Sequence, residues 1–287
     1  MRAEKIAAGM TVHSVGQGPG IVVLHGGGIT QRDYHRLANA LADRFTVHLY
    51  NRRGRIDSRP LDGTETAQTD LDDLAAVLEH TGARAVFGHS GGGFVALRAG
   101  IAGLPLDRIA VYDPGLSIDG NPPFEFVADV ERRIEAGDTV GAMTAIARGA
   151  DPDGPGGRLP MPVARFATRL FLATPIGKGM AELLPATGPE IRRIADHNGP
   201  ASDYAGIQAE VLLAAGARSA RSFTEHCEAL AAAVPRGRAV VIPGSSHNAA
   251  NVARPAFVAP FAEFFANGLV ERVDGMESGE GHRAMGG

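Results

Sequence analysis

Short apolar runs alternate with longer amphipathic segments along most of the chain. Apolar runs predict buried strands at 21–25, 45–50, 84–88, 108–113, 210–215 and 238–242. Between them, segments such as 71–78 and 223–230 carry apolar residues at helical spacing. Strands that alternate with helices predict an α/β fold with a mostly parallel, doubly wound sheet. The first residues and 11–15 predict an antiparallel hairpin at its edge.

This alternation stops for the long segment between Asp113 and Val211. Helices are predicted there at 122–130, 140–147 and 163–172, with a Pro/Gly-rich break at 151–157. We therefore predict a core made of residues 1–114 and 206–270, and a helical lid of residues 115–205 inserted after the strand that ends at Asp113. Residues 271–287 are polar and rich in glycine, so we expect a disordered tail.

One predicted strand ends in a serine flanked by glycines, Gly88-His89-Ser90-Gly91-Gly92. Glycines two positions before and after Ser90 leave room for a sharp turn from strand to helix, and the turn projects the hydroxyl outward. The N–H of Gly91, at the start of that helix, is then placed to donate to an oxyanion. A tight turn without chemistry has the same pattern, so this segment alone leaves both interpretations open.

A histidine follows the last predicted strand, in the loop that contains Ser245-Ser246-His247. A serine hydroxyl is a weak nucleophile unless an imidazole accepts its proton, and a loop after the last strand can reach the strand ends. His247 is therefore the best base candidate among the 10 histidines. A solvated surface position is the alternative for a loop histidine. His89 is expected to pack at the turn.

These segments together resemble the α/β-hydrolase family, over roughly the first 115 and last 80 residues. The run His25-Gly26-Gly27-Gly28 is similar to the loop that supplies an oxyanion N–H in esterases and lipases, and this implies that role for Gly27 or Gly28. A phosphate-binding loop would need Lys-Ser/Thr next, and residues 29–31 are Ile-Thr-Gln. A turn at 51–54 is also similar, with Asn51 where an aspartate is usual.

The acid of a catalytic triad departs from the common family pattern. After the strand at 211–216 the family often has Gly-x-x-Asp, but Ser219 stands at that position and cannot stabilise an imidazolium by charge. We predict Asp113 as the acid, because adjacent strand ends share one rim. Asp113 capping the turn before Pro114 is the alternative. Glu225 and Asp203 are the reserve carboxylates, and Ser219→Ala is expected to do little.

The resemblance implies a serine hydrolase that cleaves a small or medium carboxylic ester, thioester or lactone. Ser90 would form the acyl-enzyme with His247 as base, without metal or cofactor. A serine at position 90 disfavours dehalogenase and epoxide-hydrolase chemistry, which needs a carboxylate nucleophile. A cofactor-free lyase or perhydrolase, or a non-catalytic ligand-binding homologue, is the alternative. Residues of the insert either line an acyl pocket or form its packing core: Phe124, Met143, Phe166 and Phe171.

Composition narrows the expected partners to a small-molecule acyl substrate. The 287 residues carry a net charge of −4, with scattered basic residues and no tryptophan, which disfavours a nucleic-acid surface. Cys227 is the only cysteine, so disulfide frameworks and cysteine zinc sites are excluded. No segment has the length or pattern of a membrane span or signal peptide. We therefore expect a cytoplasmic protein without a membrane partner, of unspecified oligomeric state.

Overall fold

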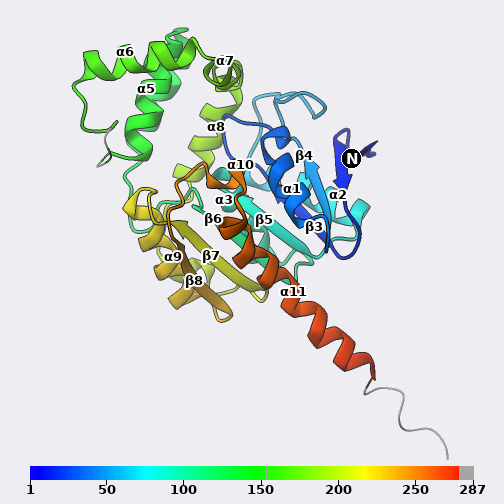
Figure 1. The fold of residues 1–287 in the computed structure, drawn as a ribbon. Helices are drawn as coiled ribbons and strands as arrows, with labels where there is room; N and C mark the ends of the chain where they lie inside the picture. The colour runs from blue at the N-terminus through cyan, green and yellow to red at the C-terminus, as the bar shows by residue number, and fades with distance from the viewer. Residues whose placement is uncertain (153, 155, 278–287) are drawn as a thin grey trace, which may run out of the picture.

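The protein is built around one eight-stranded sheet with the order β1-β2-β4-β3-β5-β6-β7-β8 (Figure 1). The computed structural model describes residues 1–152, 154 and 156–277. Its strands are β1 (Arg2–Lys5), β2 (Thr11–Val15), β3 (Gly20–Leu24), β4 (Thr46–Tyr50), β5 (Ala85–His89), β6 (Arg108–Tyr112), β7 (Glu210–Gly216) and β8 (Gly237–Ile242). The strands from β3 to β8 pair in parallel, and the hairpin β1–β2 pairs antiparallel with β4. The predicted strands, edge hairpin and doubly wound fold are confirmed.

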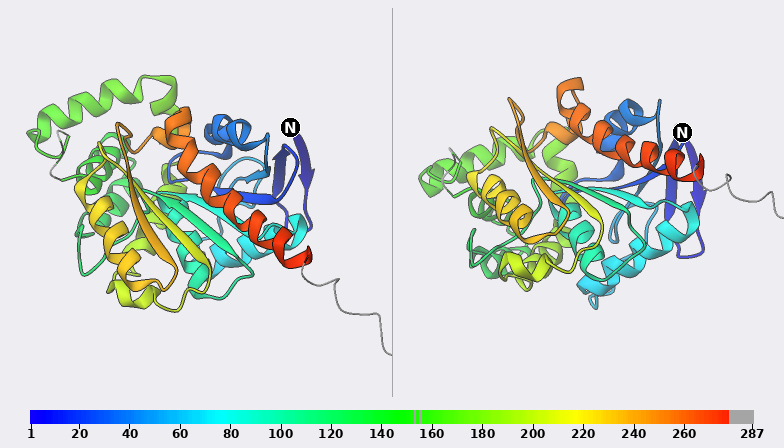
Figure 2. Two further views of the ribbon diagram at one scale, coloured as in Figure 1. Left: turned by 60° about the horizontal axis from the view of Figure 1, so that its bottom comes forward. Right: turned by 90° about the horizontal axis from the view of Figure 1, so that it is seen from below.

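Helices cover both faces of the sheet (Figure 2). One face packs against α1 (His35–Leu41), α10 (Ala249–Val252) and α11 (Pro255–Glu277), and the other against α2 (Ala67–Thr81), α3 (Gly91–Ile101) and α9 (Arg221–Ala233). Successive strand residues point to opposite faces. Along β3, Ile21 and Val23 therefore enter one core, while Val22 and Leu24 enter the other. Burial on both faces explains why the predicted strands are continuous apolar runs.

Residues 115–205, between β6 and β7, are called the helical insert, and the described part of it contains five α-helices. They are α4 (Phe126–Glu135), α5 (Thr139–Ala150), α6 (Met161–Leu172), α7 (Pro175–Glu182) and α8 (Leu184–Ala195). The prediction of a helix from 122 is wrong at its start, because Pro122 and Pro123 disfavour helical backbone before them and lack N–H donors. Helices α7 and α8 were not predicted, because their prolines and glycines are typical of loops.

A C-terminal helix, α11, follows the last strand and was not predicted. Helix α11 extends to Glu277 and so includes residues 271–277 of the predicted tail. The rest of that predicted tail, residues 278–287, lies outside the described residues. None of the described helices is long and apolar enough to cross a membrane.

Candidate active site

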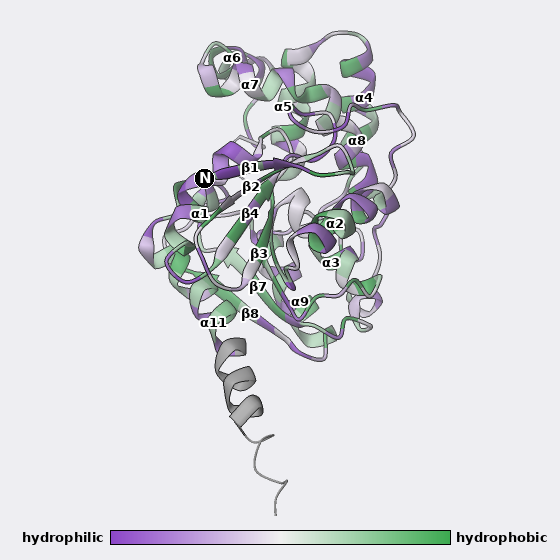
Figure 3. Cartoon of the chain, turned by 90° about the vertical axis from the view of Figure 1, so that its right-hand side faces the viewer, coloured by the Kyte–Doolittle hydropathy of each residue, from purple (hydrophilic) through white to green (hydrophobic). Residues whose placement is uncertain are grey.

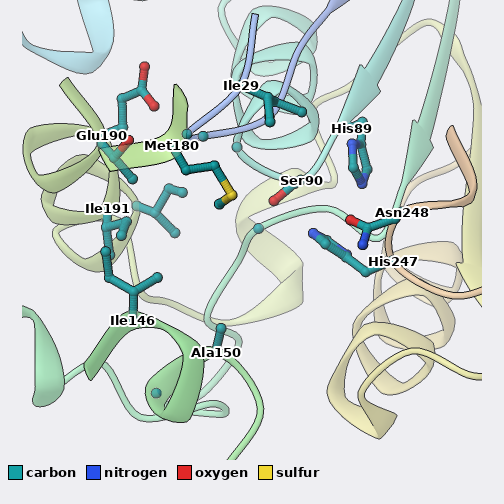
Figure 4. Close-up of a pocket in the computed structure, with 18 of the residues that line it drawn as sticks. Ile29, His89, Ser90, Ile146, Ala150, Met180, Glu190, Ile191, His247 and Asn248 are labelled. Carbon is teal, nitrogen blue, oxygen red and sulfur yellow. The ribbon is translucent and has the colours of Figure 1, made fainter. Parts of the chain in front are cut away.

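Ser90 sits at the turn between β5 and α3, with a backbone that few serines adopt. Its φ is 53° and its ψ is −122°. A Cβ on Gly88 would lie 2.5 Å from the Gly92 carbonyl oxygen, and one on Gly92 would lie 2.2 Å from the Leu24 carbonyl oxygen. Both glycines are therefore required for the turn, as the sequence pattern predicts. Figure 4 shows the Ser90 hydroxyl facing the cavity near His247.

Asp113 follows β6, the strand next to β5, and its carboxylate is fully buried (0% exposed). One oxygen, Oδ1, accepts the Gly216 N–H at 2.9 Å. The other, Oδ2, accepts the Ser219 hydroxyl at 2.6 Å and lies 3.1 Å from His247 Nδ1. Three donors thus compensate a buried negative charge, which would otherwise be unfavourable. The structure places the predicted acid and base in contact.

Ser219 has a structural role that was not predicted from the sequence. It stands at the position where the resemblance led us to look for the acid, and its hydroxyl is bonded to the same Asp113 oxygen that faces His247. The hydroxyl therefore fixes the carboxylate rather than replacing it. The expectation that Ser219→Ala does little is revised accordingly. The reserve carboxylates lie elsewhere: Glu225 accepts from Asn121 and pairs with Arg221, and Asp203 lies in the 3-10 helix η2 (Ala201–Tyr204).

His247 lies in the loop between β8 and α10, held by aromatic neighbours. Its ring stacks on Phe223 at a centroid distance of 5.0 Å and lies 4.7 Å from the His89 ring. The Tyr112 hydroxyl donates to the Ser246 carbonyl at 2.7 Å, which fixes the preceding residue. Among the described residues no hydrogen bond joins Ser90 to His247. Both line the same cavity, and such bonds commonly tighten only when substrate is bound.

The backbone N–H groups of Gly27, Gly28 and Gly91, near Ser90, have no acceptor within the described part of the chain. A Cβ on Gly91 would lie 3.7 Å from the Gly27 nitrogen, so the two donors are close together. Gly28 has a φ of 68° and packs toward Met180 instead. The loop after Asp113 also reaches this point, where the Gly115 N–H donates to the Ser90 carbonyl at 2.9 Å.

A buried tyrosine joins the glycine-rich loop to the turn that bears Ser90. The Tyr34 hydroxyl accepts the Gly26 N–H at 3.0 Å and lies 2.6 Å from His89 Nδ1. Burial raises the pKa of Tyr34, and burial together with nearby His247 holds the pKa of His89 well below its usual value. The Tyr34 phenol therefore stays protonated, and its O–H donates a hydrogen bond to the neutral His89 ring. His89 packs at the turn, as expected.

A buried group of charges lies behind the glycine-rich loop and ties the insert to the core. Arg52 and Arg193 both contact Asp70, at 3.1 and 2.9 Å. Glu190, on α8, is held by Arg55 at 2.6 Å and by Arg52 at 3.5 Å. Burial alone would raise the pKa of Glu190, but these two guanidinium groups outweigh it and lower the pKa to about 2.

This charge cluster was missed because α8 itself was missed, although the sequence analysis noted the turn at 51–54. The Asn51 amide explains the departure at that turn. Its oxygen accepts the Gln31 N–H at 2.8 Å, and its nitrogen donates to the Ile56 carbonyl at 2.8 Å. An aspartate could not make the second bond, because its carboxylate has no N–H.

A cavity of about 700 Å³ opens at Ser90 and runs toward the insert. Three of the predicted pocket residues line it, namely Phe124, Met143 and Phe171. Phe166 is wrong as a pocket residue: its side chain is on the outer surface of α6, 59% exposed. Helical spacing alone could not tell the two faces of α6 apart. No group of three or more His, Cys, Asp or Glu side chains in the described residues is arranged to hold a metal ion.

Residues 21–261 match the sequence profile of the alpha/beta hydrolase family. The chain belongs to the α/β-hydrolase family. A curated relative, an uncharacterized hydrolase named YraK from Bacillus subtilis (strain 168), is 38% identical over 87 residues. That match covers 29% of this chain and 32% of the relative, so the two are compared over only about a third of the relative's length.

Solved structures of α/β-hydrolases superpose on nearly the whole chain. An alpha/beta hydrolase from Sphaerobacter thermophilus has a TM-score of 0.76 and 26% identity, and covers 92% of this chain and 100% of its own. A thermophilic esterase from Thermogutta terrifontis has a TM-score of 0.67 and 21% identity, with coverages of 93% and 99%. An enol-lactonase from Burkholderia xenovorans has a TM-score of 0.64 and 19% identity, with coverages of 92% and 100%. The last two similarities show the fold alone.

Proposed function

We propose that this α/β-hydrolase cleaves a small or medium carboxylic ester, thioester or lactone through an acyl-enzyme on Ser90. The observation that carries the proposal is the contact of His247 with the buried Asp113, at the mouth of the cavity that Ser90 faces. Acyl transfer requires a nucleophile, a base that is oriented by an acid, and two N–H donors beside the nucleophile.

In the first half of the reaction, His247 Nε2 accepts the Ser90 proton as Oγ attacks the substrate carbonyl carbon. Asp113 holds the Nδ1–H of the ring, which leaves Nε2 free to accept, and its negative charge stabilises the imidazolium. The imidazolium then protonates the leaving oxygen or sulfur as the carbonyl re-forms. In the second half, water gives a proton to His247 and attacks the acyl carbon, which releases the acid and restores Ser90.

The tetrahedral intermediates place a negative charge on the former carbonyl oxygen. Gly27 and Gly91 are the donors that we assign to it, because the Gly27 nitrogen lies close to Gly91, whereas Gly28 packs toward Met180. The position of Gly91 at the start of α3 adds the favourable end of the helix dipole. Between the two loop glycines that the sequence leaves open, this favours Gly27 over Gly28.

The cavity indicates an apolar acyl group. Away from Ser90, Ile146 and Ala150 on α5 face Ile191 on α8, and Met180 lies above the serine (Figure 4). A volume of about 700 Å³ is within the usual range of small-molecule sites. We assign the helical insert the role of a lid, since it supplies these apolar walls. The esterase and the enol-lactonase of the same fold are consistent with this substrate class.

A fluorophosphonate probe tests the proposal directly. Intact-mass analysis should show one probe per wild-type chain, and both Ser90→Ala and His247→Ala should abolish labelling. Ser222→Ala is the matched control, because Ser222 lines the same cavity and should leave labelling unchanged. A folded wild-type protein that takes no label would contradict the proposal and favour a ligand-binding role.

A further inference from the structure

The outer surface of the insert is unusually apolar. Of the ten large apolar side chains that are exposed in the described chain, six lie between positions 161 and 176 of α6 and α7. Leu170 is 58% exposed and Ile176 is 70% exposed. We call this set the insert face; its members are Met161, Val163, Phe166, Leu170, Phe171 and Ile176. Figure 3 shows α6 and α7 at the outer edge of the molecule, away from the sheet.

The orientation of α6 is fixed by its other side. Ala164 is buried, the Thr168 hydroxyl accepts from Thr144 at 3.0 Å, and Arg165 pairs with Asp138 at 3.0 Å. Val163, Phe166 and Leu170 follow the spacing i, i+3, i+7 and therefore form a stripe on the opposite side. A surface helix normally turns such a stripe toward the core. Here polar bonds hold the helix with the stripe outward.

The charge around the insert face is opposite to that of the whole chain. Helices α6 and α7 carry three basic residues and one acidic residue, the exposed Glu182 at the end of α7, whereas the net charge of the chain is −4. Arg158, Arg169 and Lys178 are exposed. Two copies that met through this face would place like charges opposite one another, which is unfavourable. An apolar stripe flanked by cations is complementary to the anionic headgroups and acyl boundary of a bilayer.

The insert face is also continuous with the cavity. Phe171 and Ile176 belong to it and line the cavity as well. An acyl chain at the insert face therefore meets apolar side chains along the way toward Ser90. Outside the insert, the exposed Val252 also lines the cavity, whereas Ile56 and Val241 are outside the lining.

We infer that the insert face docks on the surface of a bilayer that contains anionic lipids, with α6 lying in the headgroup region. We expected no membrane partner because no segment has the pattern of a membrane span. A helix that lies in the interface follows a different pattern and does not need such a segment. Docking itself does not depend on turnover. Only the passage of an acyl group from the bilayer to Ser90 rests on the proposed function.

The test uses the full chain carrying Ser90→Ala, so that binding is measured without hydrolysis. Flotation with vesicles of phosphatidylcholine mixed with phosphatidylglycerol should carry the protein upward, and vesicles of phosphatidylcholine alone should carry much less. Arg169→Glu with Lys178→Glu should lower partition into the anionic vesicles about thirtyfold or more, at about 1 kcal/mol per cation. Phe166→Ser with Leu170→Ser should lower it about tenfold or more.

The matched controls change exposed residues outside the insert. Ile56→Ser and the pair Lys5→Glu with Arg254→Glu should leave partition unchanged. The inference is overturned by failure to bind anionic vesicles, by equal losses in the controls, or by a dimer in sedimentation velocity that Phe166→Ser with Leu170→Ser dissociates. Fluorophosphonate labelling of the surface variants with Ser90 restored distinguishes the two proposals, since it reports the serine whatever the vesicles show.

Discussion

The strand ends at Ser90 and the helical insert are built in contrasting ways. At the strand ends, each reactive group is held by short bonds and close backbone contacts, as with Asp113 and its three donors. In the insert, the outer helices α6 and α7 turn apolar side chains to solvent, and one buried charge cluster ties α8 to the core. The end of the cavity at Ser90 is therefore held by specific hydrogen bonds, whereas the end at the insert is suited to contact with varied apolar groups.

The largest expected effect is at the acid. Asp113→Asn should lower kcat for a chromogenic ester about 10⁴-fold, because Asn can no longer hold the right tautomer of His247 or stabilise its charge. Circular dichroism should show an intact fold, since the amide oxygen can still accept the Gly216 N–H. The matched substitutions Asp203→Asn and Glu225→Gln should leave kcat nearly unchanged. A larger loss of kcat in either of these variants than in Asp113→Asn would show that Asp113 is not the catalytic acid.

Glu190→Gln tests how the insert is held. It should lower the free energy of unfolding by about 3 kcal/mol near neutral pH, because Arg52 and Arg55 lose their buried anion. The carboxylate has a folded pKa of about 2 against an ordinary 4.5, so its contribution is full above 4.5 and is lost as pH falls toward 2. The difference in free energy of unfolding between wild type and Glu190→Gln should therefore decrease as the pH falls. Urea unfolding across that range measures it.

The exposed carboxylate of Glu182, on α7, provides the control for this experiment. Glu182→Gln keeps the same chemical change in the same insert, but it removes no buried ion pair. Its unfolding should follow wild type at every pH. If the difference in free energy of unfolding between wild type and Glu190→Gln did not change with pH, the charge of the Glu190 carboxylate would not be its cause.

Gly115→Ala tests the close packing beside the oxyanion donors. The new Cβ would lie 3.3 Å from the Gly91 nitrogen, closer than such contacts normally are, and it would obstruct that N–H. We expect kcat to fall about 100-fold with little change in KM, as for loss of one oxyanion donor. Gly206→Ala adds a Cβ in open space and should behave as wild type. Unchanged kcat in Gly115→Ala would argue against Gly91 as a donor.

The smallest expected effect is at Ser219. Ser219→Ala removes one charge-assisted bond to Asp113 and should lower kcat about tenfold, or about 1.4 kcal/mol of barrier. Ser219→Thr keeps the hydroxyl and should recover most of the rate. Steady-state kinetics separate this from a substrate-binding role, in which KM rather than kcat would change.

The sequence predicted the core well because its strands are buried on both faces and its key turn needs glycines. A Cβ at Gly88 or Gly92 would clash with backbone, so the pattern around Ser90 has a steric cause that can be recognised without coordinates. Asp113 could be predicted from its place at a strand end. Its bond to Ser219 could not, because the two residues are 106 positions apart and only the sheet brings them together.

The insert was less predictable for a physical reason. Pro185 lies in the first turn of α8, where proline is tolerated, but Pro189 lies inside the helix, where tertiary contacts outweigh its poor helix propensity. Because that helix was not predicted, Glu190 was not recognised either, and its partner Arg55 lies 135 positions earlier in the chain. Phe166 was misplaced because an apolar stripe does not state whether it faces a core or an external surface. In the insert, local sequence pattern therefore determined the presence of helices better than their orientation.

The backbone at the strand ends carries a further consequence for engineering. Ser90 and Asp113, with φ of 53° and 43°, are two of five non-glycine residues in the described chain that adopt left-handed backbone. Each such residue costs about 1–3 kcal/mol of folding free energy. A glycine at position 90 would relieve part of this cost while removing the nucleophile. Stability and reactivity are thus in direct opposition at that one residue, and selecting variants for thermal tolerance alone would favour an inert protein.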